Sequence, residues 1–242
     1  MIAAAKTKVE PGIYRSMPDH EYRAIDALSN SDLVEWARGE GARKIDPRAA
    51  TFGSAFHMIV LEPEIAASKI VGLEPKQKRS SYEGPDDALV LTNSDYAKLM
   101  GCYQSVKTHP QLGELMKLAR ADRDRCELAV VWRDEQTGLL LKAKLDQHTD
   151  NWLWDWKTTN SCPDSFARSV GAFGYAMQAA GYLDGAKQSG IDVKGFRFAC
   201  CSKRADKGHV CWVHELDEPW LVAGIQERRR LLTLYKRYEV SP

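Results

Sequence analysis

Apolar residues along this chain recur with two different periods, and the change of period separates predicted helices from predicted strands. A spacing of three and four residues predicts helices over residues 29–39, 51–61, 92–118, 164–188 and 218–238. Short runs of strand-forming residues bounded by turns predict strands over 126–133, 139–148, 152–158, 196–201 and 209–214. Strands on both sides of one long helix predict a single α/β or α+β domain.

Local signals refine these segments. Pro110 interrupts the helix predicted over 92–118, because proline cannot continue the helical hydrogen bonds. Residues 72–91 are polar and rich in turn residues, which predicts a mobile loop, and the residues before Ser29 predict an extended arm. A stripe along the helix over 164–188 is predicted to face the core; it consists of Phe166, Val170, Phe173 and Met177.

Length and composition limit the possible classes of protein. The chain has 242 residues, of which 44% are hydrophobic and 28% charged, as is ordinary for a globular domain. We divide one domain into an arm and helix over 1–50, a core over 51–215 and a C-terminal helix over 216–242. No apolar run approaches the roughly 18 residues that span a bilayer, and the apolar start Met1–Ala5 is too short for a secretory signal. We therefore expect a cytoplasmic protein without membrane contact. A formal net charge of +1 argues against a globally basic nucleic-acid-binding protein.

Two predicted strands carry the candidate chemistry. Asp155 and Lys157 are two positions apart on one strand, so their side chains share a face. Asp146 lies on the preceding strand, and the short turn over 149–151 places it opposite Asp155. Carboxylate oxygens with a lysine beside them can hold Mg²⁺ or Mn²⁺ next to a phosphodiester, and they suit these ions better than zinc. The pattern is typical of metal-dependent nucleases.

A simpler interpretation is that Asp155 and Lys157 form an exposed salt bridge, which contributes little to stability. The neighbouring residues argue against exposure, because Trp154 and Trp156 flank the charges and indicate a buried strand. Charged side chains on a buried strand need an ionic partner, a metal or a function.

Beyond this triplet, the chain resembles the phage and prophage RecE-type exonucleases, in the RecB-like branch of the PD-(D/E)xK nucleases related to lambda exonuclease. The resemblance covers most of the chain and depends on the order of several motifs. These are Leu28–Ser31, Gly53–Glu64 with its His57, Glu127, Lys142–Asp146, Asp155–Thr159 and Gly174–Tyr182. The chain departs from the usual pattern at Lys144-Leu145, where the family often has Arg-Pro, and near Gly39–Gly41, where a Ser-Pro is missing.

The resemblance implies a restriction-endonuclease-like core, in which a central mixed β-sheet is flanked by helices. It also implies a role for each matching residue. The implied metal ligands are His57, Asp146, Asp155 and the backbone carbonyl of Trp156, with Glu127 serving a second metal or a water. Without the family match, a lone helical histidine such as His57 is more often a core residue. Lys157 would orient the attacking water and stabilise the phosphate charge, since nearby anions keep it protonated.

Three further residues are predicted to bind substrate. Gln178 and Tyr182 lie one helical turn apart and match the family's Q-xxx-Y helix. The alternative interpretation is that both residues simply belong to the polar surface of an amphipathic helix and bind no substrate. Arg79, in the predicted loop, is a candidate contact for a 5′-phosphate.

The activity implied by the resemblance is Mg²⁺-dependent exonuclease digestion of one strand of linear double-stranded DNA in the 5′ to 3′ direction, with Mn²⁺ able to substitute for Mg²⁺. Its implied partners are DNA ends, a RecT-like single-strand annealing protein and further copies of itself in a trimeric or tetrameric ring. One alternative is an end-trimming or nicking nuclease, and another is a DNA-end-binding module without cleavage. The retained Asp146, Asp155 and Lys157 argue against the second alternative.

The cysteines do not support an iron–sulfur cluster. The chain has six cysteines without a CxxC pair or a spacing typical of zinc sites. Adjacent Cys200 and Cys201 together with Cys211 could suggest a cluster, but the usual arrangement also needs a distant N-terminal cysteine and none precedes Cys102. We therefore expect reduced structural thiols.

Overall fold

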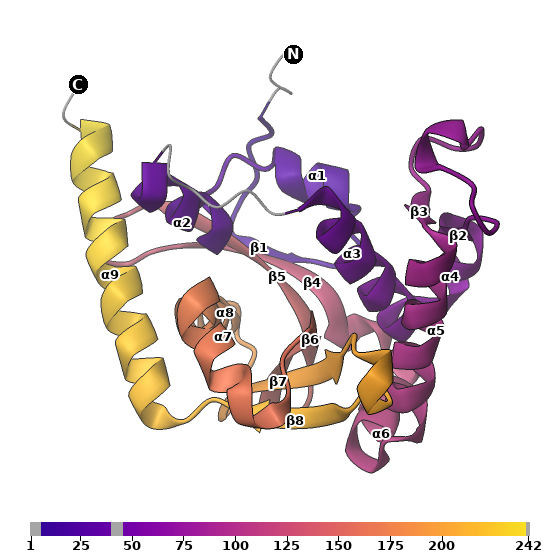
Figure 1. Ribbon diagram of the computed structural model, residues 1–242. Helices are drawn as coiled ribbons and strands as arrows, with labels where there is room; N and C mark the ends of the chain where they lie inside the picture. The colour runs from indigo at the N-terminus through magenta and orange to yellow at the C-terminus, as the bar shows by residue number, and fades with distance from the viewer. Residues whose placement is uncertain (1–5, 40–45, 241–242) are drawn as a thin grey trace.

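A six-stranded mixed sheet forms the centre of the protein (Figure 1). The computed structural model describes residues 6–39 and 46–240. Across the sheet the strands are ordered β1-β4-β5-β6-β7-β8, and neighbours are antiparallel except for the parallel pair β6 and β7. Their bounds are β1 Gly12–Tyr14, β4 Cys126–Arg133, β5 Leu140–His148, β6 Trp152–Thr159, β7 Gly195–Ser202 and β8 Cys211–Glu215. Helices α7 (Phe166–Phe173) and α8 (Tyr175–Gln188) provide the crossover that a parallel pair requires.

Helices cover both faces of this sheet, and the sheet curves around α8 (Figure 1). On one face lie α8, α9 (Glu218–Val240) and α2 (Asn30–Arg38); on the other lie α3 (Pro47–Leu61), α5 (Asn93–Thr108) and α6 (Pro110–Ala121). The structure also has two short helices, α1 (Asp19–Ala24) and α4 (Pro63–Lys69). A separate pair of parallel strands consists of β2 (Ile70–Gly72) and β3 (Leu89–Leu91). Within the described ranges, no helix has the length and apolar character needed to cross a membrane.

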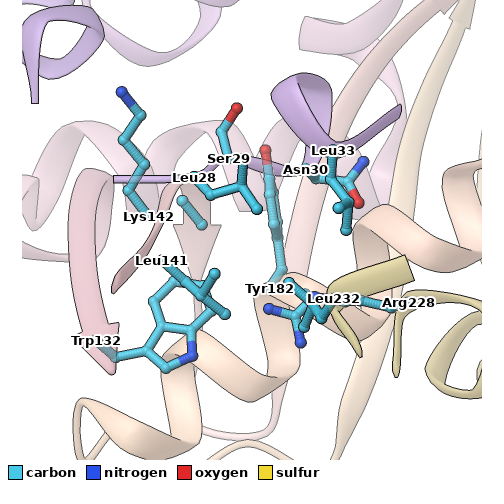
Figure 2. Close-up of a pocket in the computed structure, with 12 residues that line it drawn as sticks. Leu28, Ser29, Asn30, Leu33, Trp132, Leu141, Lys142, Tyr182, Arg228 and Leu232 are labelled. Atoms are coloured by element: carbon cyan, nitrogen blue, oxygen red, sulfur yellow. The ribbon is translucent and has the colours of Figure 1, made fainter. Parts of the chain in front are cut away.

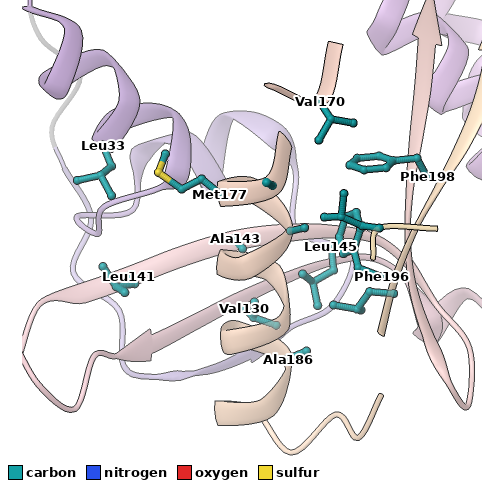
Figure 3. Packing of buried hydrophobic residues seen from close by; sticks show 14 of the residues in the cluster. Leu33, Val130, Leu141, Ala143, Leu145, Val170, Met177, Ala186, Phe196 and Phe198 are labelled. Carbon is teal, nitrogen blue, oxygen red and sulfur yellow. The ribbon is translucent and has the colours of Figure 1, made fainter. Parts of the chain in front are cut away.

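Each face has its own hydrophobic core. The α8-side core includes Leu145, Met177, Phe196 and Phe198 (Figure 3), whereas the α3-side core includes Phe56, Cys126, Trp154 and Trp156. A narrow pocket enters the α8-side core where α2, β5 and α9 meet, and Lys142, Tyr182 and Arg228 line it (Figure 2). The sheet therefore separates two independently packed layers.

The side chains of β4 and β5 change face at one point of the sheet. In β4, Leu128 packs into the α8-side core and Cys126 into the α3-side core, although residues two apart on a regular strand share a face. Between them Glu127 has a φ of 50°, a left-handed conformation uncommon for a residue with a side chain.

The same change occurs in β5 at Asp146, whose neighbours Leu145 and Gln147 pair with Leu128 and Cys126, the neighbours of Glu127. Leu145 lies in the α8-side core, whereas the amide of Gln147 donates to the carbonyl of Leu115 and accepts from the indole N–H of Trp156 on the α3 side. Glu127 and Asp146 thus occupy a local kink, and they point between the two cores.

The predicted mixed α/β fold class is confirmed, as are all five predicted strands with small changes at their ends. The helix break at His109-Pro110 is confirmed as well, and α2 begins with the predicted cap, in which Ser29 and Asp32 bond each other's backbone N–H groups. The serine-proline departure near Gly39–Gly41 and the apolar start Met1–Ala5 fall wholly or partly outside the described residues.

Other predictions were wrong. The helix over 164–188 is two helices, because Gly174 adopts a φ of 69° and ends α7; Phe173, predicted to be buried, is 46% exposed. Helix α3 begins at Pro47 instead of Thr51, since Asp46 caps it. The predicted loop over 72–91 contributes to β2 and β3 at its ends, and the N-terminal arm contains β1 and α1.

Close packing of α8 against α9 generates a stability prediction. A Cβ added to Gly224 of α9 would lie 2.2 Å from the carbonyl oxygen of Ala176 in α8. We expect Gly224→Ala to lower the free energy of unfolding by about 1–3 kcal/mol, because the helices must separate. Gly171→Ala is the matched control: its Cβ would meet only the Trp220 ring, at 3.6 Å, and better helix propensity should stabilise the protein by up to about 1 kcal/mol. Urea unfolding of both variants tests this; equal effects would contradict the packing argument.

Candidate active site

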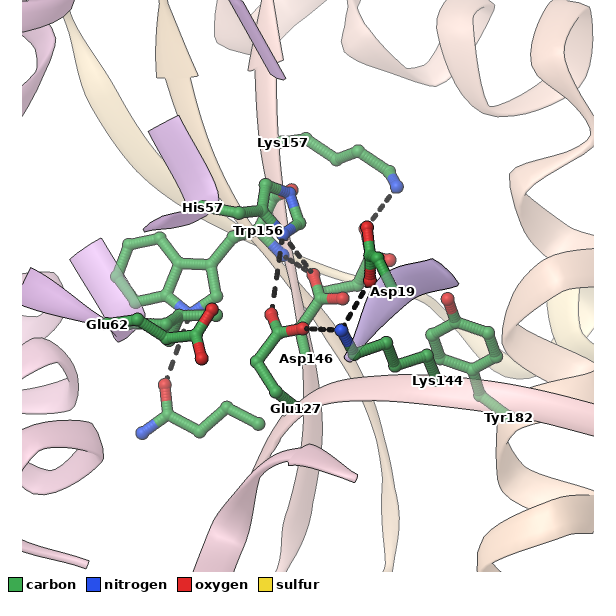
Figure 4. Close-up of polar contacts among 12 residues, drawn as sticks. Asp19, His57, Glu62, Glu127, Lys144, Asp146, Trp156, Lys157 and Tyr182 are labelled. Atoms are coloured by element: carbon green, nitrogen blue, oxygen red, sulfur yellow. Dashed lines mark hydrogen bonds and ion pairs between the residues drawn. The ribbon is translucent and has the colours of Figure 1, made fainter. Parts of the chain in front are cut away.

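Three potential metal ligands meet at the kink in the sheet. His57 of α3, Glu127 of β4 and Asp146 of β5 each offer a ligand atom, and these atoms lie within 4.8 Å of one another (Figure 4). Nearly 90 residues separate the first from the last along the chain, so the tertiary fold alone assembles the group.

Asp146 occupies the point where β5 and β6 separate. The two strands pair only at Gln147–Trp154 and His148–Leu153, so the next backbone N–H of β6 that faces β5 has no strand partner. That N–H, from Trp156, instead donates to Oδ2 of Asp146 at 2.8 Å. Burial raises the pKa of Asp146 to about 7, against the opposing effect of the nearby His57.

The imidazole of His57 is oriented by the same strand. Its Nε2 lies 2.7 Å from the carbonyl oxygen of Trp156, which can only accept, so Nε2 carries the proton. Nδ1 then faces the carboxylates, 3.5 Å from Asp146 and 4.0 Å from Glu127. Burial lowers the pKa of His57, but the charges of Asp146 and Glu127 outweigh that effect and raise it overall.

Glu127 is positioned by Lys144, a residue for which the sequence predicted no role at the site. Lys144 Nζ lies 2.9 Å from Oε2 of Glu127 and 2.6 Å from Oδ1 of Asp19 in α1. Burial lowers the pKa of Lys144, and the two carboxylates more than reverse this, so it stays charged. The position of Lys144, two residues before Asp146 on a strand, was the available sequence signal for this role.

Asp155 and Lys157 form a buried ion pair beside the three-ligand group. Lys157 Nζ lies 2.7 Å from Oδ2 of Asp155, whose side chain is 1% exposed. Burial alone would lower the pKa of Lys157, but Asp155 and Asp146 raise it overall, and the ammonium is retained. Asp155 is therefore engaged by lysine in this structure, and the group of three ligands forms without it.

Of the three predicted substrate-binding residues, two lie at the site and one lies away from it. Gln178 Nε2 donates to Asp155 Oδ1 and to the Tyr182 hydroxyl, both at 3.0 Å, so this pair lies at the site and orients the carboxylate. Arg79 instead donates to Thr51 at 3.4 Å. Since Thr51 precedes His57 by six helical residues, Arg79 contacts α3 about 9 Å along its axis from the ligand group.

The donor set fits a hard divalent cation. Two carboxylates and one imidazole nitrogen are ligands that Mn²⁺ and Mg²⁺ accept, and three protein ligands leave coordination positions open. His57 also shows the support typical of metal-binding histidines, whose second ring nitrogen donates to a backbone carbonyl. The residues present therefore fit the ion.

Comparisons with known proteins identify the family and the fold of this chain. Residues 22–239 match a family described as a PDDEXK-like domain of unknown function (DUF3799). A solved structure of a "putative exonuclease" from Eubacterium rectale superposes with a TM-score of 0.54 and 16% sequence identity, over 86% of this chain and 74% of that chain. At this identity the likeness shows the fold alone. No curated protein matches the chain significantly.

The ligand group predicts a measurable metal affinity without nucleic acid. We expect Mn²⁺ to bind the protein, and Asp146→Asn and His57→Ala each to weaken binding by more than about tenfold, since even supporting residues of metal sites contribute this much. Isothermal titration calorimetry measures the affinity, with Asp206→Asn on the surface as the control. Unchanged affinity in both site variants would contradict the assignment.

Proposed function

Because the chain belongs to the PDDEXK-like family, and thus to the PD-(D/E)xK nuclease superfamily, we propose that it is a Mg²⁺-dependent exonuclease acting on DNA. The observation that carries the proposal is the position of the His57–Glu127–Asp146 group directly beside the Asp155–Lys157 pair. A site for a divalent cation next to a fixed ammonium provides two positively charged groups that can stabilise the negative charge of a phosphodiester during hydrolysis.

Each side chain then has a definite task. His57, Glu127 and Asp146 hold the cation, which when bound supplies a Lewis acid beside the phosphate. Asp155 holds Lys157 in place, and Gln178 in turn fixes Asp155. In contact with Asp155, Lys157 remains protonated, so it stabilises negative charge on the phosphate and orients the attacking water instead of removing a proton.

Substrate and biological role are proposed from the family resemblance. The enzyme would digest one strand of linear double-stranded DNA from its end, 5′ to 3′, and leave a 3′ single strand for a RecT-like annealing protein. It would act in the cytoplasm of the bacterial host as a trimeric or tetrameric ring around the DNA. Arg79, which lies outside the ligand group and donates to Thr51 of α3, would contact the 5′-phosphate.

Loss of the buried ion pair should abolish cleavage. We expect Asp155→Asn and Lys157→Ala each to reduce the cleavage rate by at least about 10²–10³-fold, because removal of one transition-state contact has this effect in other hydrolases. Thermal unfolding checks that each variant folds, and Lys117→Ala, an exposed lysine on α6, serves as the matched control. Full activity in either site variant would show that the site lies elsewhere.

End dependence distinguishes an exonuclease from the alternative activities. We expect metal-dependent loss of 5′-phosphorylated linear duplex DNA, no loss of closed circular DNA, and no cleavage of either with a chelator. Label placed at the 5′ end of one strand should be released first if digestion runs 5′ to 3′. Cleavage of the circle would indicate a nicking endonuclease, and no cleavage at all would favour a DNA-end-binding module.

A further inference from the structure

Lys203 lies directly after β7, at the carboxyl end of the parallel pair β6 and β7. This is the edge at which open α/β sheets bind their ligands. The backbone N–H of Lys203 donates to the carbonyl oxygen of Thr159, the last residue of β6, at 2.8 Å. Thr159 is two residues beyond Lys157, which is about 7 Å along a strand. Lys203 is therefore fixed to the strand that carries the buried ion pair, at the end where β6 leaves the sheet.

The ammonium of Lys203 has an aromatic neighbour but no acidic partner. It lies 5.5 Å from the centroid of the Phe52 ring, within the range of a cation–π contact. In the part of the chain that the structure describes, no carboxylate forms an ion pair with it. Burial lowers the pKa of Lys203, and the nearby Cys102 and Asp95 offset this only in part. Because a partly buried cation without an anion costs free energy, this position favours an anionic ligand.

Two further cations lie around the same place, and the carboxylates there are already engaged. Both oxygens of Asp95 in α5 accept from the guanidinium of Arg48, one of them at 2.9 Å, and Lys98 Nζ lies 3.8 Å from the same side chain. The carboxylate of Asp46 accepts from the backbone N–H of Arg48 at 2.9 Å, where it caps α3. Arg48, Lys98 and Lys203 therefore form a cationic patch with more positive charge than its two carboxylates neutralise.

We propose that Lys203 and its cationic patch bind a backbone phosphate of the DNA strand about two nucleotides from the scissile phosphate. The inference rests on the proposed nuclease function, which places the scissile phosphate between the ligand group and Lys157. Phe52, beside Lys203, precedes His57 by five residues of α3, or about 7.5 Å along the helix axis. Phosphates of one DNA strand advance by about 3.4 Å each along the duplex axis, so two nucleotides span this distance.

Such a contact recognises the charge of the backbone and carries no information about base sequence. It requires only one strand, so it forms with single-stranded DNA and with either strand of a duplex that enters the site. The patch would thus hold the strand in register for cleavage at any sequence, which is what a general exonuclease needs.

The first test measures binding to a short single-stranded oligonucleotide with a chelator present, so that no cleavage occurs. Lys203→Met keeps the aliphatic stem over Phe52 and removes the charge. We expect it to lower the magnitude of the slope of log K against log salt concentration by about 0.7, the value for one lost phosphate contact on a single strand. Lys203→Arg should retain the wild-type slope. Lys187→Met, at an exposed lysine in the last turn of α8, is the matched control and should leave the slope unchanged.

Either of two outcomes of this binding test would overturn the proposal. One is an unchanged slope in Lys203→Met, and the other is an equal reduction in Lys203→Met and Lys187→Met, which would indicate general attraction instead of a specific contact. Thermal unfolding checks that each variant folds.

A second test locates the contact along the strand. Single uncharged methylphosphonate linkages are placed one, two, three or four nucleotides from the cleaved bond. We expect the KM of the wild-type protein to rise most with the linkage about two nucleotides away, and Lys203→Met to be insensitive to that substitution, because both changes remove the same interaction. Equal increases in KM for the two proteins at every position would contradict the assignment.

The two tests keep this inference separate from the proposed activity. Metal-dependent cleavage with an unchanged salt slope in Lys203→Met would overturn the phosphate contact and leave the nuclease function standing. A salt slope that depends on Lys203, without cleavage of any DNA, would overturn the nuclease function and support the phosphate contact.

Discussion

The separation of β5 from β6 beyond their two paired positions is the constraint on which the site depends. A buried backbone N–H without a partner costs free energy, so the N–H of Trp156 must be satisfied where the strand ladder ends. Asp146 does this with its carboxylate, and the backbone carbonyl of Trp156 accepts from His57. The backbone of a single residue of β6 thus orients two of the three candidate metal ligands. The opening between the strands is therefore held by the side chains that would hold the cation.

The distribution of charge explains why this group should attract a cation. Glu127 has Lys144 as its partner and Asp155 has Lys157, each at less than 3 Å. Among the described residues, Asp146 has only His57 within 4 Å as a potential positive partner, and its pKa is raised by burial. A divalent cation at this point would supply the missing positive charge and offset the desolvation of the carboxylate. Lys144 and Lys157 neutralise the negative charges of Glu127 and Asp155, so Asp146 is the carboxylate that lacks a lysine partner.

The second layer of the site comes from the α7–α8 crossover. Gly174 divides the crossover, and the first turns of α8 then carry both Tyr175 beside Lys157 and Gln178 beside Asp155. The close approach of α9 at Gly224 fixes α8 on the sheet. The apolar spacing of a continuous helix predicts a buried Phe173, whereas α7 ends at the left-handed Gly174 and Phe173 is 46% exposed.

The sequence by itself determined the elements whose signals are local. The period of apolar residues predicted the five main strands, Ser29 and Asp32 marked the start of α2, and the two-residue spacing put Asp155 and Lys157 on one face. Tertiary structure decided what depends on contacts between distant segments. Such contacts decided four features: the left-handed conformation of Glu127, its ion pair with Lys144, the hydrogen bond from Gln178 to Asp155, and the exposure of Phe173. The period of apolar residues indicates only which side of a segment is buried. The conformation and partners of these residues depend instead on which side chains from distant segments come into contact, chiefly where β5 and β6 separate.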